Sequence, residues 1–167
     1  LRLAASFEND LGNLERAEDS LVKVLNEHQK DPAALTSLDR IYESQGMFDN
    51  LAEVLRQRLT ITDDSADLVT LNLRLGRVYA EALGEVDPAI ASYLAVLEQD
   101  SHSRDALDAL ERLYFRSERW QELYGVYEKL VDVAKDESRL ADCYARMAKI
   151  ALILLAHLRA VAGSLLA

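Results

Sequence analysis

The sequence has 167 residues, of which 50% are hydrophobic and 29% are charged, so the chain can bury a core and is not disordered by composition. Its formal net charge of −10 argues against binding nucleic acid or an anionic membrane surface, because both need clustered excess lysine and arginine. The single cysteine, Cys143, cannot form an internal disulfide, and we interpret it as a packing residue.

The chain repeats itself without a gap, since residues 1–68 can be laid over residues 73–140 at a constant offset of 72. This offset is about twice the length of one helical-hairpin repeat, and it predicts stacked hairpins. The matches at this offset include Leu11-Gly12 with Leu83-Gly84, Ala34-Leu35 with Ala106-Leu107, Tyr42 with Tyr114, and Phe48 with Trp120.

Apolar residues recur at helical spacing, and breaks follow every 12 to 18 residues, which is typical of amphipathic helices. Pro32 marks one break, and Asp87 followed by Pro88 predicts an N-cap with proline at the first helical position. The predicted helices, in pairs of a first and a second helix, are 1–11 and 14–29, 33–45 and 48–61, 66–83 and 87–99, 104–117 and 119–134, and a last first helix at 137–155.

The end of the chain departs from the pattern, because residues 150–167 contain only His157 and Arg159 as potentially charged side chains. The turn residues of the preceding copy are replaced here, so we expect the last hairpin to form one continuous helix. Two polar interruptions near its centre argue against a membrane span. We expect its apolar face to meet further repeats of a longer protein, or a second copy of the chain in a homodimer.

These residues resemble the tetratricopeptide repeat family. In one repeat the pattern reads Leu75-Gly76, Tyr79, Gly84, Ala89, Tyr93 and Leu97. The resemblance implies an all-α fold, a right-handed α-solenoid of stacked antiparallel helix hairpins. The helix pattern predicts one domain over 1–167 with about 4.5 repeats, at 1–32, 33–67, 68–103, 104–138 and, in part, 139–167. The apolar end without a polar cap leads us to expect an excerpt of a longer array. The chain departs from the family at Glu118, which stands where a turn glycine is expected.

A row of cations follows the first helices. The residue two positions after the core residue Leu75, or after its equivalent in another repeat, lies on the opposite face of the helix. In the family resembled here, this face lines a concave groove that binds peptides. Four successive repeats place a cation at this position, namely Arg40, Arg77, Arg112 and Lys149. Further groove candidates are the cations Arg74, Arg146 and Arg116 and the aromatic Phe115, the best candidate for an apolar anchor.

Two interpretations of this row stay open. In one, the cations form an electropositive groove for an acidic peptide or a terminal carboxylate, held by bidentate arginine contacts. In the other, they pair along their own helices, each pair contributing about 0.2 to 0.5 kcal/mol. The pairs that the spacing allows are Arg77 with Glu81, Arg112 with Asp108, and Arg40 with Glu43.

No combination of residues predicts catalysis, and we expect no cofactor and no metal. The histidines His28, His102 and His157 lie far apart and at no metal-like spacing. The sequence therefore favours a non-catalytic scaffold for protein–protein interaction, which binds a peptide or partner segment in the groove. The alternative is a structural spacer or self-association module without a groove ligand.

Overall fold

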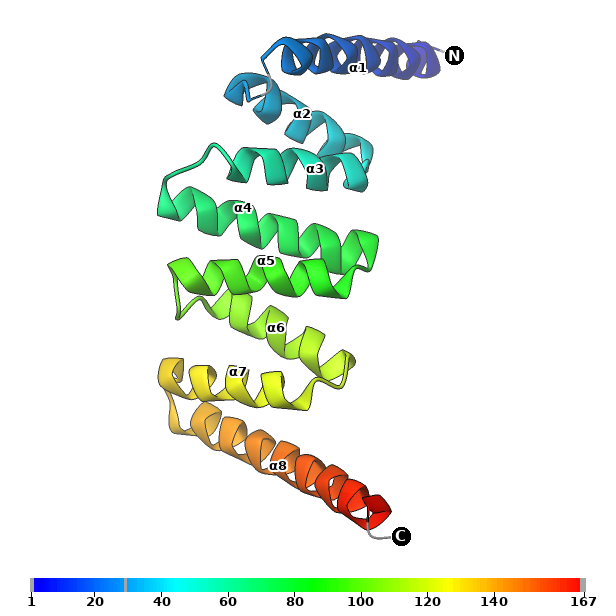
Figure 1. Cartoon of the computed structure of the whole chain (residues 1–167). Coiled ribbons are helices and arrows are strands. Elements are labelled where there is room, and N and C mark those ends of the chain that lie inside the picture. Colours follow the sequence, from blue (N-terminus) through cyan, green and yellow to red (C-terminus); the bar gives the residue numbers. More distant parts are fainter. Residues whose placement is uncertain (1, 29, 166–167) are drawn as a thin grey trace. The chain divides into compact units, whose positions relative to one another are not determined.

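The computed structural model describes the backbone of residues 2–28 and 30–165 and the side chains of residues 13–28 and 30–160. Every regular element in these ranges is helical, as predicted, and consecutive α-helices within each half of the chain run antiparallel (Figure 1). The elements are α1 (Arg2–Glu27), α2 (Pro32–Gln45), α3 (Phe48–Leu59), α4 (Ser65–Arg77), η1 (Val78–Leu83), α5 (Val86–Gln99), α6 (Arg104–Arg116), α7 (Trp120–Val133) and α8 (Glu137–Leu165). The element η1 is a π-helix that directly continues α4.

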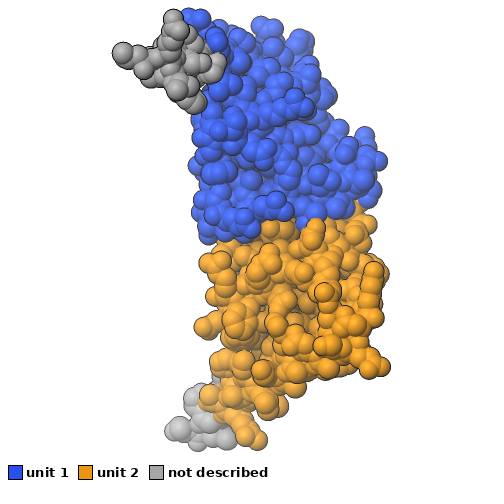
Figure 2. All heavy atoms as spheres, turned by 180° about the vertical axis from the view of Figure 1, so that it is seen from behind, with its two compact units in different colours: residues 1–85 blue, residues 86–167 orange. Residues whose placement is uncertain are grey.

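The contacts divide the chain into two compact units, Leu1–Glu85 and Val86–Ala167, which are blue and orange in Figure 2. In unit 1, α1 packs on α2, α2 on α3, and α3 on α4 and η1. In unit 2, α5 packs on α6, α6 on α7, and α7 on α8. Each unit is therefore built from neighbouring antiparallel helices. The single domain, its repeat boundaries and its membership of a longer array stay predictions.

The 72-residue offset also relates the cores of the two units. Leucine side chains that are almost fully buried occupy equivalent positions on α2 and α6 and on α3 and α7, because these positions face the neighbouring helix of the hairpin. The pairs are Leu35 with Leu107, Leu38 with Leu110, and Leu51 with Leu123.

The helix ends show why the sequence breaks where it does. The Asp31 carboxylate accepts a hydrogen bond of 2.8 Å from the Ala34 N–H, and Pro32 follows at the start of α2. At the other end of α2, Gly46 has φ = 68°, a left-handed conformation that glycine adopts without steric cost. Gly84 ends η1 in the same way at φ = 71°. Glu118, which corresponds to Gly46 at the 72-residue offset, adopts φ = 56° with a full side chain.

Two predicted boundaries are wrong. The hairpin predicted from helices 1–11 and 14–29 is one continuous helix, α1. Gly12 lies inside it, because a helical glycine costs only about 1 kcal/mol relative to alanine. Asp87 is not an N-cap, since α5 already begins at Val86. Pro88 is tolerated there because the N–H groups of a first helical turn have no partner within the helix.

The prediction of one continuous helix at the end of the chain is confirmed by α8, which has 29 residues. Its second half exposes three leucines spaced three residues apart, Leu152, Leu155 and Leu158. None of the described helices is long and apolar enough to cross a membrane.

Three tyrosines at repeat-equivalent positions are buried, whereas two other recurring aromatic side chains are not. Tyr42, Tyr79 and Tyr114 are buried. Phe48 is exposed, and Trp120 is only half-buried. Both begin a second helix directly after a tight turn, where less protein surrounds the ring than in the middle of the hairpin.

Candidate functional site

The cations of the predicted groove fall into two groups. Arg40, Arg77, Arg112 and Lys149 are exposed, and among the described side chains none of them has an ion pair within 4.0 Å. The pairing along the helix that the sequence allowed does not form. Each exposed cation therefore keeps its charge available to an external group.

Two carboxylates of the expected pairs, Asp108 and Glu43, bind other arginines. Asp108 contacts Arg104 at 3.3 Å, although the spacing also allowed Arg112. Glu43 contacts Arg74 at 3.2 Å, although the spacing also allowed Arg40.

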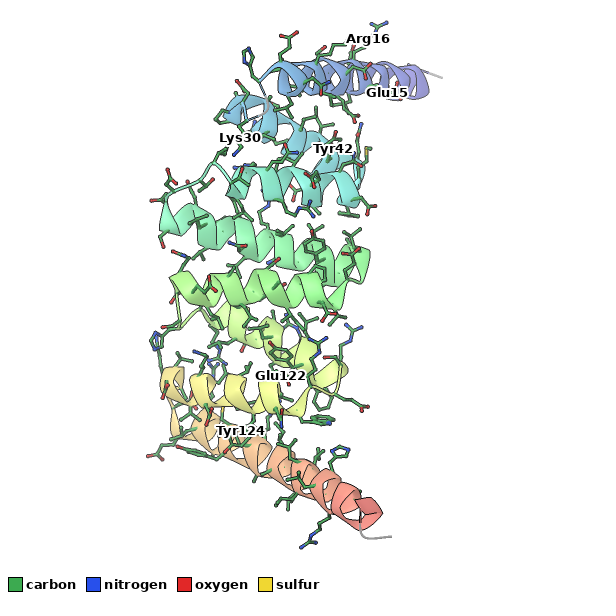
Figure 3. All side chains as sticks on the ribbon, viewed as in Figure 1. Glu15, Arg16, Lys30, Tyr42, Glu122 and Tyr124 are labelled. Atoms are coloured by element: carbon green, nitrogen blue, oxygen red, sulfur yellow. The ribbon has the colours of Figure 1, made fainter. Side chains whose placement is uncertain are left out.

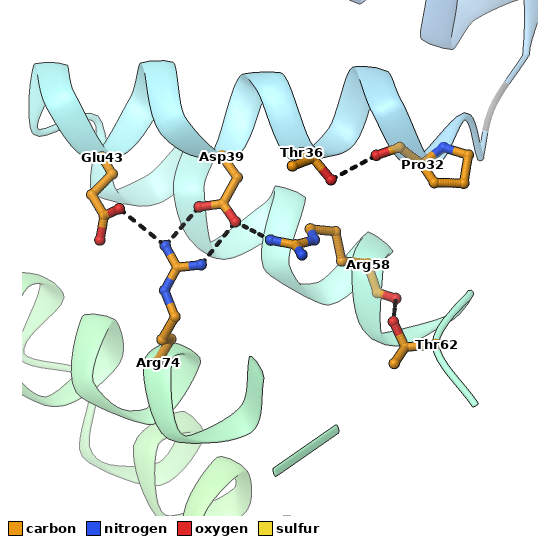
Figure 4. A network of polar contacts seen from close by, with 7 residues as sticks. All are labelled: Pro32, Thr36, Asp39, Glu43, Arg58, Thr62 and Arg74. Atoms are coloured by element: carbon orange, nitrogen blue, oxygen red, sulfur yellow. Dashed lines mark hydrogen bonds and ion pairs between the residues drawn. The ribbon is translucent and has the colours of Figure 1, made fainter. Parts of the chain in front are cut away.

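Arg74 belongs to the second group, because its guanidinium is bound within a network of ion pairs inside unit 1 (Figure 4). Its guanidinium donates two hydrogen bonds, of 2.8 and 2.7 Å, to the two oxygens of Asp39 on α2. Arg58 on α3 donates to the same carboxylate. Asp39 is 4% exposed, and the bond to Asp39 is the main cause that raises the pKa of Arg74.

Arg146 takes the equivalent role in unit 2. It contacts Glu111 on α6 at 2.6 Å and Asp142 on its own helix at 2.9 Å. The Tyr127 hydroxyl donates a 2.7 Å hydrogen bond to Glu111, and Arg146 lies 3.2 Å from this hydroxyl. Burial, followed by the bond to Glu111, raises the pKa of Tyr127 to about 12.

The sequence analysis assigned Arg74 and Arg146 to the groove and missed their partners, Asp39 and Glu111. A signal was present, since an acid directly follows the core leucine in both copies, at Leu38-Asp39 and Leu110-Glu111. In both copies an arginine stands 35 residues after that acid. This spacing connects one first helix to the next.

A cavity of about 470 Å³ opens between α6, α7 and α8, and we call it the Phe115 cavity. Phe115 is 61% exposed and meets Trp120 edge-to-face, with ring centroids 5.9 Å apart. Arg112, Arg146 and Lys149 also line this cavity, so four of the predicted site residues share it. The cavity combines an apolar aromatic surface with two cations, Arg112 and Lys149, that have no ion pair among the described side chains. Glu111 and Asp142 line it as well, and both pair with Arg146. Arg116, at the end of α6, is exposed and does not line it.

A second cavity of unit 2, of about 460 Å³, lies toward the beginnings of α6 and α8, and we call it the Glu111 cavity. Leu130 and Ala134 of α7 form its apolar wall, and Glu111 and Asp142 line it as well. The half-buried thiol of Cys143 also faces it.

In unit 1 a cavity of about 540 Å³ lies along α1, α2 and α3. Lys30 and Tyr42, which line it, come from the turn before α2 and from the far end of α2 (Figure 3). The Tyr42 hydroxyl donates a 3.1 Å hydrogen bond to Glu18 of α1. The described residues contain no group of three or more His, Cys, Asp or Glu side chains that could hold a metal ion.

Stacked antiparallel hairpins with a recurring core define a helical repeat protein. Two family models, both described as tetratricopeptide repeat, match residues 34–69 and 106–141 and residues 71–103, together more than half of the chain. The chain belongs to the tetratricopeptide repeat family. Repeats of this family generally mediate protein–protein interaction, and proteins built from them are generally non-catalytic.

Solved structures show the same fold. A tetratricopeptide repeat protein from Parabacteroides merdae is 23% identical with a TM-score of 0.58, and the match covers 89% of this chain and 58% of that one. The chain thus spans less than two thirds of that protein. A crystal structure of MamA is 15% identical with a TM-score of 0.55, and the match covers 91% of this chain and 95% of that one. No curated protein matches the sequence.

Proposed function

We propose that the protein is an interaction scaffold whose unit 2 binds an acidic segment of a partner protein in the Phe115 cavity. The observation that carries this proposal is that Arg112 and Lys149 line one cavity with the exposed ring of Phe115, and that neither cation has an ion pair within the described part of the chain. Arginine binds carboxylates through a planar fork, and exposed aromatic rings anchor apolar side chains. Arg40 and Arg77 hold the same repeat positions in unit 1, where they are also exposed.

The experiment selects peptides from a random phage-displayed library on the intact chain and measures their affinity by titration. We expect enrichment of peptides that combine acidic and apolar residues. Arg112→Glu with Lys149→Glu should weaken them at least about tenfold, since two favourable charge contacts become repulsive. The loss should shrink at high salt, which screens exposed charges.

Two control variants test whether a loss of peptide affinity comes from this cavity. Phe115→Ala should weaken the same peptides, whereas Arg116→Glu, which changes an exposed charge outside the cavity, should leave them nearly unchanged. Selected peptides without acidic residues would refute the proposal. So would unchanged affinity in the Arg112→Glu, Lys149→Glu variant.

A second candidate function is self-association through α8, and the exposed row Leu152, Leu155 and Leu158 favours it. A soluble helix that leaves three leucines on one side in water loses the free energy of burying them, about 1.5 to 3 kcal/mol each. Sedimentation equilibrium tests it. A dimer that dissociates on Leu155→Lys is the expected result, and a strict monomer at high protein concentration would remove this function.

A further inference from the structure

The two longest helices, α1 with 26 residues and α8 with 29, each pack on a single neighbour. In the described part of the chain α1 packs on α2, and α8 packs on α7. By contrast, α2 packs on both α1 and α3, and α7 packs on both α6 and α8. Each of these contacts joins a first helix of the repeat pattern to a second helix. Residues 14–27 of α1 follow the pattern of a second helix and residues 137–155 of α8 that of a first helix, so each lacks one neighbour of the opposite type.

The uncovered face of α1 is formed by Ala17, Leu21 and Val24. At an offset of 106 residues, these three correspond to Leu123, Tyr127 and Leu130 of α7. The three side chains of α7 are buried, because α7 has a first helix on each side. In α1, however, Val24 is 38% exposed, and Ala17 and Leu21 are only half-buried. A first helix is therefore missing from this face of α1.

The uncovered face of α8 is formed by Tyr144, Met147 and Ala151. At the 37-residue offset that relates the groove cations of α6 and α8, these three correspond to Leu107, Leu110 and Tyr114 of α6. The three side chains of α6 are buried, because α6 packs on the second helices α5 and α7. In α8, Tyr144 is 53% exposed, and Met147 and Ala151 are half-buried. A second helix is therefore missing from this face of α8.

The two uncovered faces suit each other better than they suit themselves. Because α1 and α8 have similar lengths, an antiparallel pair can extend along the second half of α8, where its row of exposed leucines lies. Residues 13–27 carry four acids and two bases, whereas residues 137–160 carry four bases and two acids. Arg146 already pairs with Glu111 of α6, but the remaining bases of α8 still outnumber its acids. Opposite net charges favour a pair of α1 with α8 over a pair of identical helices.

We propose that the protein associates head to tail, with α8 of one copy packed antiparallel on α1 of the next copy. This proposal rests on the second candidate function, self-association through α8, and names the surface that α8 meets. The contact rebuilds the pairing of a first with a second helix that is seen between α6 and α7. Because it joins two different faces, a dimer keeps one free face of each kind, and further copies add unless a ring closes.

The experiment uses two variants of the intact chain, each blocked at one face. Val24→Glu blocks α1, and Tyr144→Glu blocks α8, because docking would bury the new charge without a partner. In sedimentation equilibrium, the unaltered chain should form dimers and then larger species as its concentration rises. Each variant alone should associate at least about tenfold more weakly. An equimolar mixture of the two should form a one-to-one dimer and nothing larger, since one variant keeps α8 intact and the other keeps α1 intact.

A matched control uses Val22, which has the same 38% exposure as Val24 but lies two residues away, on the opposite side of α1. Val22→Glu should leave association unchanged, and so should Phe115→Ala, which alters the proposed peptide site. Circular dichroism checks the helix content of every variant. If a glutamate variant loses helix content, Val24→Ser or Tyr144→Ser takes its place.

The outcomes separate this proposal from the function on which it rests. A strict monomer at high protein concentration would refute both. A dimer of Val24→Glu as tight as that of the unaltered chain would show that α8 pairs with α8, which keeps self-association and overturns the head-to-tail contact. A mixture of two folded variants that stays monomeric would overturn the contact as well.

Discussion

The Asp39 carboxylate gives the sharpest stability prediction, because it is the most buried charge in the network of unit 1. Replacement by alanine removes the bidentate contact with Arg74 and the contact with Arg58. Breaking a buried ion pair costs about 3 to 5 kcal/mol, because the remaining charge stays without a partner. The side chains of Arg58 and Arg74 are 25% and 31% exposed, so water recovers part of this cost. We expect Asp39→Ala to lower the free energy of unfolding by about 3 kcal/mol.

Glu111→Ala is the matched control in unit 2. The Glu111 and Arg146 side chains are 23% and 48% exposed, and Arg146 keeps Asp142 as a second partner. We therefore expect a loss of only about 1 kcal/mol, typical of an exposed pair. Urea unfolding followed by far-UV circular dichroism measures both variants. Alanine improves helix propensity by up to about 0.7 kcal/mol, so each measured loss is a lower bound on the lost interaction.

A double substitution tests the electrostatic cause. Asp39→Ala leaves two guanidinium groups facing each other, and Arg58→Leu, which copies Leu130 of unit 2, removes one of them. The double variant should lose less stability than the sum of the single variants, because the repulsion is relieved. Additive losses would refute this reasoning, as would an Asp39→Ala cost no larger than that of Glu111→Ala.

Two further predictions concern unit 2. Glu118→Gly should raise the free energy of unfolding by about 0.5 to 1 kcal/mol, because φ = 56° strains a residue with a Cβ. The greater conformational freedom of glycine in the unfolded chain offsets only part of this gain. Thermal unfolding measures the change, and a lower melting temperature would contradict the prediction. Tyr127 is neutral in the fold up to a pKa of about 12, compared with 10.0 unfolded. Its stabilising contribution is therefore complete below pH 10 and is lost as the pH rises toward about 12. Tyr127→Phe should remove this part of the alkaline decline in urea unfolding, and an unchanged decline would contradict the assignment.

The helices from α2 to α7 could be predicted from the sequence because short-range signals determine them. Apolar spacing sets the buried face, and residues such as Asp31, Pro32 and Gly46 fix where a helix begins and ends. The first hairpin could not be predicted in this way, because Gly12 is compatible with a turn and with a helix. The difference in free energy between a helical hairpin and one continuous helix decides which of them forms, and this difference depends on packing.

The candidate site was harder to predict for a related reason. Exposure of Arg112 and Lys149 follows from the helical period, and the structure places both beside Phe115 in one cavity. The internal roles of Arg74 and Arg146 depend on which helix lies next to their own. Spacing within a single helix cannot show a partner that stands 35 residues earlier.

Comparison of the two units suggests how one repeat can be structural and its copy can bind. In unit 1, Asp39 and Glu43 meet Arg58 and Arg74, so two negative and two positive charges satisfy one another. In unit 2, Phe115 replaces Glu43 and Leu130 replaces Arg58. The first replacement places an exposed ring beside Arg112 in one cavity. The second removes a guanidinium, and the Tyr127 hydroxyl donates to Glu111 in its place.

Both replacements keep the Glu111–Arg146 pair that connects α6 to α8. The helix-to-helix contact is thereby retained while two groups that completed the network in unit 1 are lost. The carboxylate of the network thus has two donor residues in each unit, whereas Phe115 is left 61% exposed in unit 2. An exposed aromatic ring in a cavity gains free energy when a partner covers it, so Phe115 is the replacement at which we expect a partner of unit 2 to bind.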